Sequence, residues 1–409
     1  MSTIVAKRVA AAPASQQSRD SFAYDRMRCE PPPYDLAALS RAYEEDPDVY
    51  LCCNAIAAKA VGAGWEVTGE GPDDARSFFS DASRERPLLE TLRLAYLDLN
   101  LLGNAYIEVA RDGRDRPAGL WWIPAREMRA RRDGDGFCQR TASDRYTLFN
   151  PYTPRASDRA AARATGEWHR AEGGGWANEV IAWRLPNPNS RFYGLPPAYV
   201  AAKDILADAS VKDSNIAFFQ NGMLPDYVLA VKGGTLSEGT LEEIRTFLQD
   251  AHRGVDRHHG MIILEAIPAV RGENVSLELI PMQQAAREMP FLAYRKFAIE
   301  NKVRAFRVPM SKAGINQAGR LGEASGREEA ETFKTEVVEP QQTMVEHSFD
   351  ALLRDDLRAP TLGFRFRDME SRDTVQMAEA AARLAGNEAV LSPEAARAWL
   401  GIPDGVAPA

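Results

Sequence analysis

The stretch "FYGLPPAYVAAKDILADASVKDSNIAFFQNG", residues 192–222, decides how the chain is organised. Pro196 and Pro197 suit the first turn of a helix, where a missing backbone N–H costs nothing. Asn221-Gly222 can take the left-handed conformation that ends a helix, so a helix is predicted over 198–220, a rod of roughly 35 Å. Its charged side chains exclude a membrane span. Its bulky residues are few, and the alanines between them favour close packing against other helices.

The composition is that of a folded protein. With 45% hydrophobic and 26% charged residues, the 409-residue chain is expected to form about two or three domains. The net charge of −8 argues against a protein that binds nucleic acid over its whole surface, although it permits a local basic patch. The cysteines have no Cys-x-x-Cys spacing, and Cys52-Cys53 lies in an apolar run typical of a core. Residues 1–20 lack the apolar segment of a signal peptide, so a cytoplasmic site of synthesis is expected.

The patterns along the chain predict an α+β protein with an elongated hairpin. Residues 30 to about 190 contain predicted helices over 49–61 and 88–102 and strands in stretches such as "NAYIEVARD" and "EVIAWRL". After the first rod comes a small mixed unit, with strands in "DYVLAVKGG", "HGMIILEAIPAV" and "SLELIPM" and a helix in "LSEGTLEEIRTFLQDAH". A second rod over 290–306 follows. Two matched rods with a small unit between them indicate a hairpin with a tip.

The C-terminal third continues with a polar, glycine-bearing loop, "SKAGINQAGRLGEASG". A long helix is predicted over 327–357, and Pro340 should kink it. "LGFRFRD" alternates as a returning strand, and "SPEAARAWLGIP" indicates a final capped helix.

Signatures of catalysis are missing from the sequence. No phosphate-binding loop of the Gly-x-x-x-x-Gly-Lys-Ser/Thr type occurs, and no Gly-x-Gly-x-x-Gly, His-Glu-x-x-His or Gly-x-Ser-x-Gly motif. His252, His258 and His259 could in principle hold zinc, but with acidic help only from Asp256 a solvated turn is favoured. The sequence therefore predicts no enzyme, no catalytic residue, no metal site and no cofactor.

Positive charge is concentrated near the end of the second rod. One acid, Glu300, stands among the six basic residues of 295–312, which are Arg295, Lys296, Lys302, Arg304, Arg307 and Lys312. The loop beyond adds Arg320 and Arg327, with Asn316 and Gln317 before them. In a single subunit, a solvated helix face balanced by acids elsewhere is the favoured interpretation. In a ring with this loop inside, the same charges would meet a phosphate backbone without reading its sequence.

Five motifs occur in the order known from one family. They are "LLGNAYIEV" at 101–109, "FYGLPPAYVAA" at 192–202, "FFQNGMLPDYVL" at 218–229, "FAIENKVRAFRVPMSKAGI" at 297–315 and "GREEAETFKTEVVEPQQ" at 326–342. On these motifs the chain resembles the tailed-bacteriophage portal proteins, closest to the PBSX-type branch, over about residues 30–355. The closing "LSPEAARAWLGIP" looks like the family's C-terminal helix, whereas the loop "GINQAGRLGEASG" does not map residue by residue.

The resemblance implies the portal fold, whose parts would divide this chain as follows. They are a flexible tail (1–29), an α+β wing (30–190), a stem helix (191–222), a small α/β clip (223–285), a second stem helix (286–307), a tunnel loop (308–325), a long kinked wing helix with a returning strand (326–370) and a short helical crown (371–409). The DNA-channel residues would be Lys312, Asn316, Gln317, Arg320, Arg304 and Arg307.

The resemblance also implies a function and partners. Portal subunits form a ring, commonly a dodecamer, at one capsid vertex, and double-stranded DNA is packaged and ejected through it without sequence preference. The implied partners are a large terminase that hydrolyses ATP, the major capsid and scaffold proteins, and a head–tail adaptor, with no membrane. The protein would be part of the virion and would assemble in the host bacterial cytoplasm.

Two other functions stay open at this point. Another head-vertex protein, an adaptor or connector, would lack the hairpin of two rods and a tip. A cytoplasmic nucleic-acid-binding enzyme could use the basic stretch 295–327, but it would need a metal or nucleotide site, and the sequence offers none.

Overall fold

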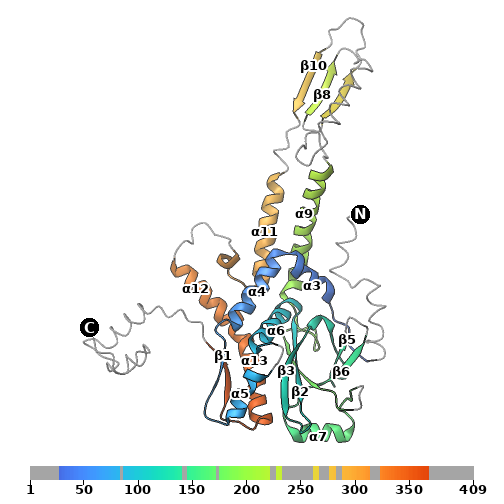
Figure 1. Ribbon diagram of the computed structural model, residues 1–409. Helices are drawn as coiled ribbons and strands as arrows, with labels where there is room; N and C mark the ends of the chain where they lie inside the picture. The colour runs from blue at the N-terminus through green and yellow to red at the C-terminus, as the bar shows by residue number, and fades with distance from the viewer. Residues whose placement is uncertain are drawn as a thin grey trace, which may run out of the picture.

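The computed structural model describes residues 27–82, 86–140, 145–171, 175–221, 227–232, 261–266, 276–281, 288–313 and 323–367. Helices and strands form a body, from which α9 (Ala202–Asn221) and α11 (Glu288–Phe306) project side by side (Figure 1). Beyond their far ends lies a three-stranded sheet of order β10-β8-β9, formed by β8 (Tyr227–Lys232), β9 (Met261–Ala266) and β10 (Ser276–Pro281). The predicted succession of rod, small unit and rod is therefore present.

The body is built on a six-stranded sheet of order β3-β2-β7-β6-β5-β4. Its strands are β2 (Asn104–Arg111), β3 (Pro117–Ile123), β4 (Met128–Ala130), β5 (Phe137–Arg140), β6 (Tyr146–Pro151) and β7 (Glu179–Arg184). β2 pairs antiparallel with both β3 and β7, whereas β6 runs parallel to β7. Helix α6 (Leu88–Leu102) packs against β2 and β3 and buries Leu92, Tyr96 and Leu99, which are spaced at helical intervals.

Two adjacent aspartate-capped helices complete the upper part of the body. Asp35 accepts backbone hydrogen bonds at the start of α3 (Leu36–Glu45), and Asp46 does the same for α4 (Pro47–Val61). Helix α4 packs on α6 and also on α11, so it connects the body to the hairpin. Cys52 and Cys53 are fully buried on α4, which confirms the prediction that this pair belongs to the core.

A close approach of two glycines sets where the first rod leaves the body. Gly103 ends α6 with φ 76°, and a Cβ on it would lie 2.7 Å from the carbonyl oxygen of Gly194. The Tyr34 hydroxyl lies 2.6 Å from the same oxygen and 2.9 Å from the carbonyl oxygen of Leu102. The segment before α8 (Pro197–Val200) is thereby fixed to the end of α6.

The long C-terminal helical segment differs from the prediction in two ways. It begins as α12 at Glu323 rather than at 327, and it contains two π-helical turns, η3 (Lys334–Val338) and η4 (Leu352–Asp356), on either side of α13 (Glu339–Ala351). The first π-helical turn, η3, ends two residues before Pro340, which lies in the first turn of α13. Pro340 has no backbone N–H, so it cannot continue the α-helical hydrogen bonding at this point.

The chain then returns as β11 (Gly363–Phe366), which pairs antiparallel with β1 (Trp65–Thr68). A buried ion-pair network holds η4 to the large sheet. Asp356 lies 2.9 Å from Arg111 and 3.0 Å from Arg159, and the Tyr152 hydroxyl donates to it. Arg111 also pairs with Glu179 on β7.

Most of the other predicted elements have close counterparts. Helices predicted over 49–61 and 88–102 are α4 and α6, and the second rod starts at 288 instead of 290. The first rod is interrupted at Ala201, between α8 and α9. The predicted helices in the tip and at the C-terminus and the histidine cluster lie outside the described residues. Among the residues that the structure describes, no helix combines the length and apolar character needed to cross a membrane.

Candidate functional site

The basic residues proposed from the sequence lie where α11 ends and the chain turns towards α12. Arg304 is in the last turn of α11, Arg307 is the first residue after this helix, and Lys312 lies in the short 3-10 helix η2 (Met310–Ala313). Asn316, Gln317 and Arg320 lie outside the described residues. The structure thus brings together three of the six predicted site residues along one short connection.

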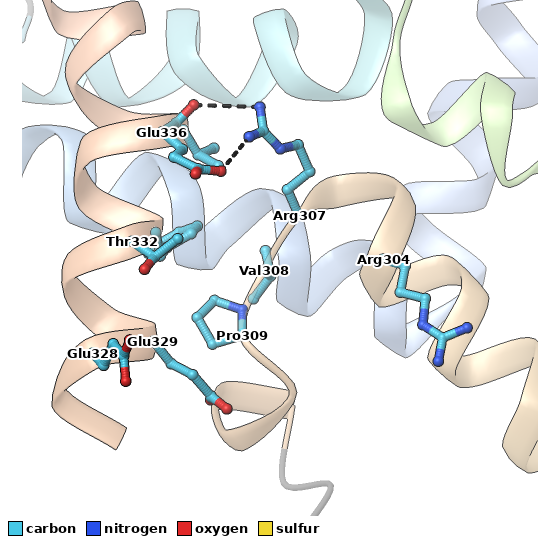
Figure 2. Close-up of a pocket in the computed structure, with 10 residues that line it drawn as sticks. Arg304, Arg307, Val308, Pro309, Glu328, Glu329, Thr332 and Glu336 are labelled. Atoms are coloured by element: carbon cyan, nitrogen blue, oxygen red, sulfur yellow. Dashed lines mark hydrogen bonds and ion pairs between the residues drawn. The ribbon is translucent and has the colours of Figure 1, made fainter. Parts of the chain in front are cut away.

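This connection forms one wall of a groove of about 600 Å³, and α12 and η3 form the other (Figure 2). Val308, Pro309, Phe333 and Val337 supply its apolar lining. The charged lining residues are Arg304 and Arg307 on one wall and Glu328, Glu329 and Glu336 on the other. The groove therefore has a basic side and an acidic side.

Arg307 is held across this groove. Its guanidinium donates to the Glu336 carboxylate at 2.6 Å and to the Glu336 carbonyl oxygen at 3.4 Å (Figure 2). Its backbone is left-handed, with φ 57°, a conformation that is costly for a residue with a Cβ. Among the described residues, the ion pair of Arg304 is a long one with Glu300, 3.8 Å, and the Arg304 side chain is 60% exposed.

Lys312 contacts an aromatic ring. Its ammonium lies 5.2 Å from the centre of the Phe333 ring, a cation–π distance. Burial, and then the nearby Lys59 ammonium, lower the pKa of Lys312. Phe333 itself is buried at the end of α12. Lys312 is therefore more restrained than a freely solvated lysine.

Lys302 has a different environment from the rest of the basic stretch. The structure leaves its side chain with no exposed surface, and its Nζ atom lies 2.8 Å from Asp46, 2.5 Å from Asp48 and 3.1 Å from Asp208. The prediction that all six basic residues of this stretch could face a phosphate backbone is wrong for Lys302. Lys302 lies on the same side of α11 as the buried Val303 and Phe306. A lysine placed within an apolar stripe of a helix is the feature of the sequence that could have indicated its burial.

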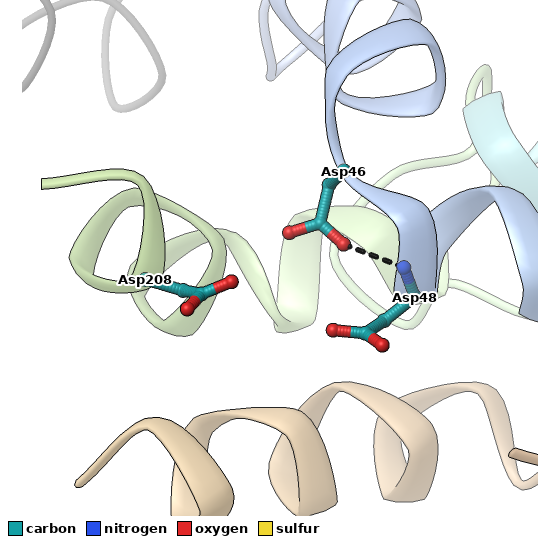
Figure 3. A group of neighbouring side chains, drawn as sticks. All are labelled: Asp46, Asp48 and Asp208. Carbon is teal, nitrogen blue, oxygen red and sulfur yellow. Dashed lines mark hydrogen bonds between the residues drawn. The ribbon is translucent and has the colours of Figure 1, made fainter. Parts of the chain in front are cut away.

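The three aspartates come from two parts of the fold (Figure 3). One oxygen of Asp46 caps α4 by accepting from the N–H groups of Asp48 and Val49, and the other accepts from Lys302. Asp208 comes from α9. Three clustered carboxylates could hold a metal ion, but here the Lys302 ammonium lies within hydrogen-bonding distance of all three and supplies the positive charge. The cluster joins α4, α9 and α11.

The electrostatics of the cluster are mutually stabilising. Burial would lower the pKa of Lys302, but hydrogen bonds to Asp46 and Asp48 raise it overall. Burial would likewise raise the pKa of Asp208, but hydrogen bonds from Lys212 and Lys302 lower it. Both partners are therefore charged at neutral pH, as a buried ion pair requires.

Comparison with known proteins gives one family over most of the chain. The family model described as "Phage portal protein" matches residues 47–401. Two Bacillus subtilis (strain 168) proteins are each 22% identical to this chain. They are the uncharacterized protein YqbA, with 92% of this chain and 83% of YqbA covered, and the phage-like element PBSX protein XkdE, with 85% and 79% covered.

A solved structure has the same fold. A chain in "Neck of native GTA particle computed with C12 symmetry" superposes with a TM-score of 0.64 at 19% identity, covering 90% of this chain and 94% of that one. At this identity the likeness is one of fold, and it extends over the body and the hairpin together.

Proposed function

Because this chain belongs to the phage portal protein family, we propose that it forms a closed ring at one vertex of a phage-type capsid, through which double-stranded DNA is packaged and ejected. The rod–sheet–rod hairpin supports this role over that of another head-vertex adaptor, which would lack it. The protein is a structural component of the virion in this proposal, assembled in the host cytoplasm.

The observation that carries the ring is where apolar side chains are left uncovered. Among the described residues, the four most exposed large hydrophobic side chains are Val200 (59%), Tyr50 (54%), Ile216 (53%) and Phe297 (52%). All four lie on α8, α4, α9 and α11, which form the hairpin and its root. Single exposed apolar residues are ordinary, but here two lie on the projecting rods, Ile216 and Phe297, and two lie on the helices at their root, Tyr50 and Val200. Their gathering along the hairpin and its root supports a surface that neighbouring subunits cover. Identical subunits with head-to-tail contacts close into a ring when the rotation between them closes.

The parts of the chain then have the following proposed roles. The stem is 191–222 with 286–307, the clip is 223–285, the tunnel loop is 308–325, the wing is 30–190 with 326–370, and the crown is 371–409. We propose that Arg304, Arg307 and Lys312, together with Asn316, Gln317 and Arg320, line the DNA path. The large terminase would dock on the clip, and capsid, scaffold and head–tail adaptor proteins would contact the rest.

Electron microscopy of the purified protein tests this proposal, with analytical ultracentrifugation on the same sample. We expect closed rings with a central hole, and a charged variant at the stem surface, Phe297→Asp with Ile216→Asp, should remain monomeric and folded. Lys203→Asp, a charge change at an exposed position of α9, is the matched control and should still form rings. Wild-type protein that stays monomeric at micromolar concentration in both low and high salt would contradict the ring.

A further inference from the structure

Phe297 points away from the rest of its own subunit. Its side chain is 52% exposed, although the same helix, α11, is buried at Lys302 and at Phe306. These two residues follow Phe297 by five and nine positions, which at about 100° per residue places them about 140° and 180° around the helix from it. Lys302 contacts α4 through Asp48. The face of α11 that carries Phe297 is therefore the one directed away from α4.

Tyr50 points out of the opposite side of these two packed helices. The carboxylate of Asp48 lies between α4 and α11 (Figure 3), and Tyr50 follows Asp48 by two residues, about 200° around α4, so it faces away from α11. The Tyr50 side chain is 54% exposed but ordered. The Tyr43 ring lies 5.1 Å from it, and the Asn54 amide donates to the Tyr43 hydroxyl and to the Tyr50 carbonyl oxygen. An aromatic side chain that is already held in place loses little entropy when a partner covers it.

The two faces carry opposite charges. Glu44 and Glu45 are exposed at the end of α3, where it meets the start of α4, and Lys296 is exposed on α11 directly before the phenylalanine. Among the residues that the structure describes, none of these three side chains takes part in an ion pair. Arg41, one turn earlier on α3, offsets only one of the two acids. Opposite charges on two surfaces favour their association and set its orientation.

The two faces also lie at nearly the same level of the hairpin. Lys302 contacts Asp46 and Asp48 at the start of α4, so this part of α11 lies beside the junction of α3 and α4. Phe297 is five residues further from the body, about 7.5 Å at 1.5 Å per residue. Opposite faces at one level suit a head-to-tail contact, because each subunit then offers a different surface to each of its two neighbours.

We propose that the α3–α4 corner of one subunit, residues 44–50, packs in the ring against the face of α11 that carries Lys296 and Phe297 in the next subunit. The aromatic side chains of the two faces cover each other, and the acids of the corner meet Lys296. The occupant is a second copy of this chain, because the chain supplies both complementary faces and they point in opposite directions within one subunit. The inference rests on the proposed ring and goes beyond it by naming the two surfaces that meet.

Cross-linking between introduced cysteines tests the contact, since all four native cysteines are buried. Tyr50→Cys and Phe297→Cys are made separately and together in the full-length chain. A short bismaleimide joins them, because two aromatic side chains that touch leave their Cα atoms too far apart for a disulfide. On a denaturing gel the double variant should give a ladder of covalent multimers, and a mixture of the two single variants should give dimers and nothing larger. Each single variant alone should stay monomeric.

The matched control combines Tyr50→Cys with Arg114→Cys. Arg114 is exposed in the turn between β2 and β3, and its neighbour Asp115 pairs with Arg159 on α7, at the end of the body away from the hairpin (Figure 1). This variant should give no ladder, because the proposed contact involves the root of the hairpin alone.

Charge reversal gives an independent measurement, and it decides the question if the cysteines themselves prevent assembly. Glu44→Lys with Glu45→Lys should raise the concentration at which rings dissociate about tenfold at low salt, and Lys296→Glu should raise it several-fold. The three changes together should restore most of the ring stability, because opposite charges then face each other again. Analytical ultracentrifugation measures the dissociation, and thermal denaturation shows that each variant is folded. Failure of the triple variant to recover would overturn the contact.

Microscopy of the same samples judges the ring and the contact separately. A ladder together with rings supports both. Rings without a ladder would overturn the contact alone, and a ladder from open chains without rings would overturn the ring alone. Dimers from either single variant by itself would show that like surfaces meet, which would overturn the head-to-tail arrangement. Absence of both rings and cross-links would overturn both proposals.

Discussion

Lys302 and Arg304 are separated by one residue on α11, yet their environments are opposite. The Lys302 side chain has no exposed surface and lies against three aspartates, whereas that of Arg304 is 60% exposed beside one distant glutamate. In the sequence they are two members of the same basic stretch. The comparison teaches that burial, and not charge count, decides whether a cation holds the fold together or is available to a ligand.

The largest expected effect is at the buried site. Lys302→Met removes the buried ammonium that contacts all three clustered carboxylates and leaves Asp46 and Asp48 without it, and breaking a buried pair in this way costs about 3–5 kcal/mol of unfolding free energy. Chemical denaturation measures it, with Lys203→Met as the exposed control, expected within about 0.5 kcal/mol of wild type. A Lys302→Met protein as stable as the control would mean that the cluster does not hold the hairpin to the body.

A double variant sharpens the same point. Adding Asp208→Asn to Lys302→Met removes one of the uncompensated carboxylates, so the pair should lose less stability than the sum of the two single changes, by about 1 kcal/mol or more. Strict additivity of the two changes would show that Lys302 and Asp208 do not interact.

Acid should remove the contribution of the buried Asp208 only at low pH, because the pKa of this carboxyl group is lowered in the folded protein. The pKa of Asp208 is lowered in the folded protein, so its contribution to stability is present above its unfolded value, about 3.9, and is lost as the pH falls through the lower folded value. Stability measured between pH 6 and pH 2 should therefore fall less steeply in Asp208→Asn than in the wild type. Identical pH profiles would contradict this assignment.

Arg307 is intermediate between the buried Lys302 and the exposed Arg304. Its pair with Glu336 is exposed on both sides and contributes under about 1 kcal/mol. Its left-handed backbone makes glycine the better residue by about 1 kcal/mol, so Arg307→Gly should be more stable than Arg307→Ala by that amount. Thermal denaturation of the two variants compares them directly, and equal midpoints would show that the φ of 57° is not strained.

The smallest effect on stability is expected from Arg304→Ala with Lys312→Ala. Exposed charges contribute under about 1 kcal/mol each, so the double variant should fold and form rings. If these residues line the DNA path, packaged DNA per particle should nevertheless fall, because a ring repeats each change in every subunit. Normal packaging by intact mutant rings would remove both residues from the path.

Predictions from local signals were the most accurate. Gly103 ends α6 in the left-handed conformation, Gly62 follows α4, and the second rod ends at Phe306 as expected, because caps and helical periodicity act over a few residues. The π-turns at 334–338 and 352–356 were missed. A π-turn has no composition of its own, and here η4 coincides with the burial of Asp356 in a network contributed by β2, β7 and α7 (Ala156–Thr165).

The sequence by itself determined the order of elements, the two rods with a strand-bearing unit between them, and through its ordered motifs the family. Only the tertiary structure decided which cations are buried and which are available. Lys302 meets Asp46 from 256 positions away. The physical reason is that helix caps and periodicity depend on near neighbours, whereas the role of a charge depends on desolvation and on partners that folding alone brings within a few ångströms.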